Sequence, residues 1–143
     1  MESICDECGA RYADATDSCA HRFDLLLAFD HSREEPWGSR HGLAFAVFAL
    51  QHPRRFPAAT GSRALELLRR VVERGEDLDT VVREMRGRIP TAAGMGSPER
   101  RSRSSYPVTI ADLGDFAAAD YAARLDEWCR ATLSCFASDS TWP

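Results

Sequence analysis

The segment "CDECGA" at residues 5–10 constrains this chain more than any other stretch of its sequence. It places two thiols three positions apart, a spacing at which both sulfurs of one tight turn can face a common point. Gly9 can take the positive φ that such a knuckle often needs. The pair therefore predicts half of a tetrahedral zinc site. A thioredoxin-like redox pair would instead open a helix after a strand, and no strand is predicted before Cys5.

The composition indicates one globular domain, residues 1–143, with 44% hydrophobic residues to build its core. The net charge of −4 argues against nucleic acid as the main partner. We find no signal-peptide pattern and no apolar run of the roughly 20 residues that cross a membrane, so we expect a cytoplasmic protein. In that compartment the five cysteines favour metal binding or packing over disulfides.

The spacing of apolar residues predicts an all-α fold, an irregular four- or five-helix bundle that follows an N-terminal zinc-knuckle segment at residues 1–18. No segment has the pattern of a convincing strand. The segment 40–52 is apolar on nearly all sides, so it is expected to be the buried central helix, or to help form a homodimer. The predicted helices cover residues 19–31, 40–52, 62–75, 77–88 and 115–136, with a short helical turn after Thr109.

Local signals predict where these helices begin and end. Ser18 or Asp17 is expected to cap the first helix, and Ser62 the third. Pro53 should end the second helix and Gly75 the third.

Two segments between the helices are predicted to be loops. The segment 32–39 contains Pro36 and Gly38, which interrupt helices. The segment 89–107 is rich in Gly, Ser, Pro and Arg and has no periodicity, so we expect a flexible Arg/Ser-rich loop. Its arginines could hold a phosphate or a carboxylate, or the loop could be a solvated linker. These arginines are Arg100, Arg101 and Arg103.

The second half of the zinc site must come from elsewhere in the chain. If the helices at 19–31 and 40–52 form an antiparallel hairpin, Cys19 and His52 share one end of it. His31 and His41 then lie at the opposite end. The most economical site is therefore a Cys3His set made of Cys5, Cys8, Cys19 and His52.

Other residues remain open as ligands. His21 follows Cys19 by two positions, and side chains at i and i+2 of a helix face apart. His41 and His52 lie about 16 Å apart along one helix, so one site cannot use both while that helix is regular. Cys129 and Cys135 face different directions on the last helix and are expected to be core thiols.

The segments "CDECGA" and "HGLAFAVFALQHP" (residues 41–53), with a cysteine opening the helix between them, resemble a family of small bacterial proteins of unknown function. The resemblance covers most of residues 5–53 and continues weakly through "VTIADL" into the last helix. It implies no established activity. It singles out five positions: Cys5, Cys8, Cys19, His41 and His52.

This chain departs from the family's pattern at two positions. The family's helix reads "HxLxxDxYAVQHP", whereas this chain has Ala46 at the acidic position and Phe48 at the tyrosine position. The resemblance therefore implies that a polar site between the two histidines is partly erased here.

These patterns support two functional hypotheses. Three thiolates weaken the Lewis acidity of zinc, so a closed Cys3His site favours a zinc-stabilised small helical module that binds a protein partner or a small ligand. The alternative is a small zinc-containing enzyme of bacterial specialised metabolism, with an inter-helix pocket near His41. There His41 could form an acid–base pair with Asp30 or with other nearby carboxylates. The acidic "CDEC" disfavours DNA binding through the knuckle.

Overall fold

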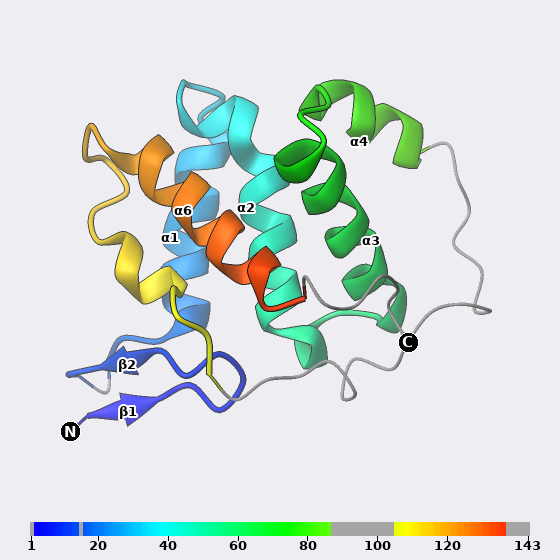
Figure 1. Cartoon of the computed structure of the whole chain (residues 1–143). Helices are drawn as coiled ribbons and strands as arrows, with labels where there is room; N and C mark the ends of the chain where they lie inside the picture. The colour runs from blue at the N-terminus through cyan, green and yellow to red at the C-terminus, as the bar shows by residue number, and fades with distance from the viewer. Residues whose placement is uncertain (1, 15, 87–104, 137–143) are drawn as a thin grey trace.

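The bundle is organised around one helix, α2 (Trp37–Gln51), which lies between α1 (Cys19–His31) and α3 (Ala58–Leu68). A further long helix, α6 (Tyr121–Ser134), crosses this layer and contacts α2 and α3 (Figure 1). Most side chains of α2 are buried, which confirms the predicted all-α fold with this helix at its centre. The computed structural model describes residues 2–14, 16–86 and 105–136.

The first two helices form the predicted antiparallel hairpin. Helix α1 begins at Cys19 because the Ser18 hydroxyl caps it, accepting a hydrogen bond from the backbone of His21. The rings of Phe23 and Phe48 stack between the two helices, with their centroids 3.9 Å apart. This packing fixes which ends of the helices meet.

Helix α2 begins at Trp37, three residues earlier than predicted, so Gly38 belongs to its first turn rather than to a loop. A Cβ atom at Gly38 would lie 3.0 Å from the backbone of Arg33. Glycine is therefore favoured by a close approach between the helix and the preceding loop. The helix ends before Pro53, as predicted, and a short 3-10 turn (Pro53–Arg55) follows.

The predicted start of the third helix was wrong. Helix α3 begins at Ala58, directly after Pro57, so Ser62 lies inside the helix and does not cap it. A proline fixes its own φ and commonly precedes or opens a helix, which explains the earlier start. The helix continues as a π-helical segment, Arg69–Glu73, and the chain reverses at Gly75, whose φ is 69°.

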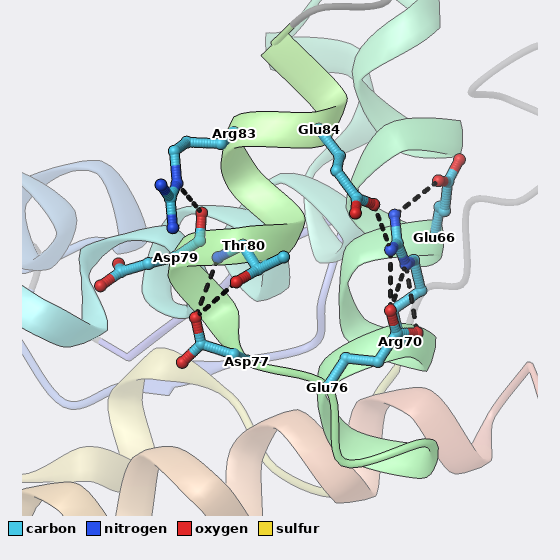
Figure 2. Close-up of polar contacts among 8 residues, drawn as sticks. All are labelled: Glu66, Arg70, Glu76, Asp77, Asp79, Thr80, Arg83 and Glu84. Carbon is cyan, nitrogen blue, oxygen red and sulfur yellow. Dashed lines mark hydrogen bonds and ion pairs between the residues drawn. The ribbon is translucent and has the colours of Figure 1, made fainter.

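Helix α4 (Leu78–Arg86) is joined to α3 by an arginine that bonds to several carboxylates. Figure 2 shows the Arg70 guanidinium among Glu66, Glu76 and Glu84. Its hydrogen bonds to Glu76 are 2.7 to 3.2 Å long, and they lower the pKa of that carboxyl group. The first turn of α4 is capped by Asp77, which accepts hydrogen bonds from the backbone and hydroxyl of Thr80 (Figure 2).

The C-terminal part of the bundle differs from the predicted helix at 115–136. Thr109 opens a short 3-10 helix (Ile110–Leu113), as predicted. Gly114 then adopts a φ of 63°, and successive turns occupy residues 115–120, so α6 begins only at Tyr121. Arg22 of α1 holds this region in place, because its guanidinium donates to the carbonyls of Ile110 and Gly114.

The N-terminal segment contains a small β-hairpin that the sequence did not predict. Strands β1 (Ser3–Ile4) and β2 (Arg11–Tyr12) pair antiparallel, on either side of the knuckle. With two residues in each strand, neither has the length from which alternation can be recognised. Gly9 adopts a φ of 84°, as predicted for the knuckle.

Parts of two predictions lie outside the described residues. These parts are residues 89–104 of the predicted loop, with its three arginines, and the predicted end of the fourth helix at residues 87–88. The last residues of the predicted loop are described, and Tyr106 among them is buried and donates its backbone N–H to the carbonyl of Cys8. None of the helices in the described ranges is both long enough and apolar enough to cross a lipid bilayer.

The last turn of α2 is tied to α6 by a buried amide. The Gln51 side chain donates to the carbonyl of Val108 and to the Thr132 hydroxyl, at 2.8 Å each. It is fully buried, so these bonds compensate for the removal of its NH2 group from water. One residue thus links α2, α6 and the segment between them.

We expect Gln51→Leu to lower the free energy of unfolding by about 1–3 kcal/mol, because it leaves two buried partners unsatisfied. Chemical denaturation measures this change. Thr132→Val removes the bond between Gln51 and Thr132 from the other side. The double variant should therefore lose less stability than the sum of the losses in the two single variants. Fully additive losses would contradict the proposed coupling.

We expect Arg70→Gln to detach α4 from α3 while the rest of the bundle stays folded. Amide hydrogen exchange across residues 78–86 should become roughly tenfold faster or more, because local opening no longer breaks the bonds to Glu76 and Glu84. Arg83→Gln is the matched control, since Arg83 bonds only within α4 in Figure 2. Equal exchange in the two variants would contradict this role of Arg70.

Candidate metal centre

Three thiols and one imidazole converge where the knuckle meets the α1–α2 hairpin. The ligand atoms of Cys5, Cys8, Cys19 and His52 all lie within 4.8 Å of one another. The sulfurs of Cys8 and Cys19 are 3.6 Å apart, close to the edge of about 3.8 Å expected for sulfurs bound to one tetrahedral zinc ion. The structure thus brings together the four residues that the sequence analysis selected, in a group that could hold a metal ion.

His52 is oriented for such a role by its own helix. Its Nδ1 lies 2.8 Å from the carbonyl oxygen of Phe48, so Nδ1 carries the proton and donates it there. The Phe48 ring also stacks on the imidazole, with centroids 4.1 Å apart. Nε2 is buried and has no hydrogen-bond partner in the described part of the chain, which makes it the nitrogen available to a metal.

The electrostatics of the cluster favour a bound cation. Hydrogen bonds from the thiols of Cys19 and Cys8 lower the pKa of Cys5, so one thiolate is readily formed. Hydrogen bonds with Cys19 and Cys5, followed by burial, raise the pKa of Cys8, and the bond with Cys5 raises the pKa of Cys19 to about 11. Ionising all three thiols together therefore needs a positive charge among them.

Further donors surround the sulfurs. The Tyr12 hydroxyl, on strand β2, donates to the sulfur of Cys19 at 3.0 Å, and burial raises the pKa of this phenol, which keeps its proton. The backbone amides of Cys8 and Ala10 also act to lower the pKa of Cys5 and of Cys8, respectively. Such contacts orient thiolate ligands and offset part of their charge. Although its strands are short, the hairpin positions Tyr12 against the cluster.

The acidic pair between the first two cysteines attaches the knuckle to the turn after His52. Glu7 is buried, accepts a hydrogen bond from the backbone of Arg54 and pairs with the Arg55 guanidinium at 3.3 Å. Asp6 pairs with Arg54 at 3.4 Å on the surface. The knuckle is therefore attached by charge to the turn that follows α2, in addition to the contact between the sulfurs of Cys8 and Cys19. The sequence contains the signal for this contact, "CDEC" and "HPRR", but no spacing rule connects segments so far apart.

The alternative ligands lie elsewhere. His21 is exposed on α1 and is outside the cluster. Cys129 is buried in the core, where burial raises its pKa to about 12. Cys135 packs against the same core. These two cysteines are core thiols, as predicted.

His41 lies at the opposite end of the hairpin and pairs with Asp30. Nδ1 of the imidazole is 2.8 Å from a carboxylate oxygen of Asp30, whose side chain is only 2% exposed. This hydrogen bond, opposed by partial burial, raises the pKa of His41 above its ordinary value. The predicted juxtaposition of the two residues is present, and His41 is not part of the cysteine cluster.

His41 also lines a cavity of about 330 Å³ between α2, α3 and α4. This volume is within the range of small-molecule sites, about 300–1,000 Å³. Its walls are mostly apolar, and Arg63 and Arg86 are among the lining residues. The sequence predicts a pocket near His41 but none of the residues that α3 and α4 contribute. No local pattern marks them, because the cavity depends on how three helices pack.

One family model matches residues 3–137, and its description is "Family of unknown function (DUF5946)". No curated protein and no solved structure matches the chain. The matched residues include the cysteine–histidine cluster, the His41–Asp30 pair and every helix in the described part of the chain. The chain therefore belongs to DUF5946, a family of unknown function.

Proposed function

We propose that this chain is a small helical module that a structural zinc ion stabilises, and that it binds a protein partner or a small ligand. The observation that carries this proposal is the convergence of three thiols and one buried imidazole nitrogen from three separate segments. Those segments are the knuckle, the start of α1 and the end of α2. A bound ion would join them at one point.

Zinc is the ion that best suits these donors. It is borderline soft, redox-inert and tetrahedral, and it takes thiolate and imidazole ligands together. Four protein ligands fill a tetrahedral shell, which leaves no open position for a substrate or a reactive water. Three thiolates also supply more negative charge than the ion carries. Both properties favour a structural role, in which the energy of metal binding contributes to folding.

We expect the wild-type protein, purified without chelator, to contain about one equivalent of zinc, and Cys5→Ser to lose most of it. Cys5 is the least buried of the three cysteines in the cluster, so its substitution disturbs the core least. Losing the ion should lower the free energy of unfolding by about 3 kcal/mol or more. Elemental analysis and denaturation of the same samples measure both effects.

Cys135→Ser is the matched control, because this thiol lies outside the cluster and bonds only to the carbonyl of Ala131 in the described structure. It should keep its zinc and most of its stability. A chelator should lower the stability of the wild type and of Cys135→Ser but leave Cys5→Ser nearly unchanged. A wild-type protein without metal would overturn the proposal.

A second candidate function is supported by the His41–Asp30 pair. A buried carboxylate that orients an imidazole at the edge of a cavity is an arrangement used in acid–base catalysis. In this candidate, the chain is a small enzyme whose chemistry takes place near His41, about three helical turns from the zinc. The zinc would then remain structural.

The test of this pair is a titration of His41 by NMR. We expect a pKa above the ordinary value of about 6.5 in the wild type and a lower one in Asp30→Asn, where the raising interaction is lost and burial remains. Because the folded pKa is raised, the pair stabilises the fold fully below the unfolded pKa. That contribution disappears as the pH rises through the folded value. An unchanged titration in Asp30→Asn would leave His41 without its acid–base partner.

A further inference from the structure

The cavity between α2, α3 and α4 has one apolar interior and a cationic edge. Phe45 and Ala46 of α2, Leu67 of α3, and Val82 and Met85 of α4 form its walls. Helix α4 packs directly over Gly42 of α2, where a Cβ atom would lie at the ordinary contact distance of 3.5 Å from Leu78 and Val82. Three helices thus form the interior, and a small apolar group inside it could contact all three.

The polar groups of the cavity are cationic or donate hydrogen bonds. Arg86 is exposed at the end of α4, and Arg63 crosses from α3 to donate to the carbonyl of Met85 at 2.8 Å. His41 is held by Asp30 through Nδ1, so Nε2 is the nitrogen with which it can contact a ligand. No aspartate or glutamate is among the described lining residues. The edge therefore complements an anion.

We propose that this cavity binds a small amphiphilic carboxylate, with its apolar part between the three helices and its carboxylate on Arg86 and Arg63. The proposal rests on the small-ligand part of the proposed function, and it names the chemical class of that ligand. Guanidinium groups bind carboxylates through paired, charge-assisted hydrogen bonds. The volume of about 330 Å³ suits a small molecule and is too small for a folded partner or a helix.

The position of α4 determines whether this site exists. Arg70 fixes α4 to α3 through Glu76 and Glu84, on the side shown in Figure 2. The cavity lies where the remaining faces of these helices meet α2. A ligand would add contacts across the same three helices, so its binding should also slow amide exchange in α4.

The test is a titration of the isotope-labelled, zinc-loaded full chain with decanoate, followed by NMR. We expect saturable shifts in the amides of the cavity-lining turns of α2, α3 and α4. Decan-1-ol and decylamine carry the same tail with a neutral or a cationic head, and each should bind at least roughly tenfold more weakly. Equal binding of decanoate and decan-1-ol would overturn the carboxylate assignment.

Three variants separate the parts of the site. Arg86→Gln should weaken decanoate binding roughly tenfold, whereas Arg83→Gln, on the same helix but outside the cavity lining, should leave it unchanged. Ala64→Leu places a larger side chain into the cavity and should abolish binding. Its spectrum shows directly whether the bundle remains folded. If it does not, Ala46→Val, a smaller increase in volume at another wall position, replaces it.

Zinc content measured on the same samples keeps this inference separate from the structural zinc. A zinc-loaded, folded protein that binds none of the probes overturns the ligand assignment alone. A protein that binds decanoate but contains no metal overturns the zinc alone. Binding that Arg86→Gln and Arg83→Gln weaken equally would place the carboxylate elsewhere on the surface.

Discussion

The structure depends on the C-terminal end of α2, where three consecutive residues have three different roles. Gln51 bonds to α6 and to the segment before it, His52 presents its imidazole to the cysteines, and Pro53 ends the helix. Gln51 and His52 are both fully buried, so each polar group must find a partner inside the protein. The NH2 group of Gln51 finds its partners in α6 and in the segment before it. Nε2 of His52 has none in the described part of the chain, and a metal ion would supply one.

At this end of α2, hydrogen bonds and ion pairs hold the knuckle in place in addition to its cysteine sulfurs. Glu7 reaches the turn after His52 and bonds to Arg54 and Arg55, and Tyr106 bonds to the Cys8 carbonyl. These contacts orient the N-terminal segment over the end of α2 before any metal is considered. They reduce the entropy that metal binding must overcome, because two of the cysteines are already near the other ligands. The same contacts mean that the loss of metal should weaken the fold rather than abolish it.

The sequence predicted most where the determinants are local. Helix α1 was predicted at its observed bounds because Ser18 caps it and its apolar spacing is regular, and Pro53 and Gly75 acted as expected. The starts of α2, α3 and α6 were missed. At Gly38, the backbone of Arg33 approaches the first turn of α2 closely. The turns at residues 115–120 follow Gly114, which is in the left-handed region. Such causes are tertiary or conformational, and periodicity does not report them.

The same distinction applies to the two ends of α2. The cysteine cluster could be predicted because zinc imposes residue types and spacings that remain visible in a sequence. The cavity at the His41 end could be predicted only in part, since it depends on how α4 packs over Gly42 of α2 and on the ion pairs of Arg70. Neither residue belongs to a recognisable motif. Helix α2 therefore joins a region fixed by many buried contacts to a region bordered by α4, which has only two buried side chains, Val81 and Met85, besides the ion pairs of Arg70. Because local openings occur where buried contacts are fewest, ligand-dependent motion in this protein is expected at α4 rather than at the knuckle.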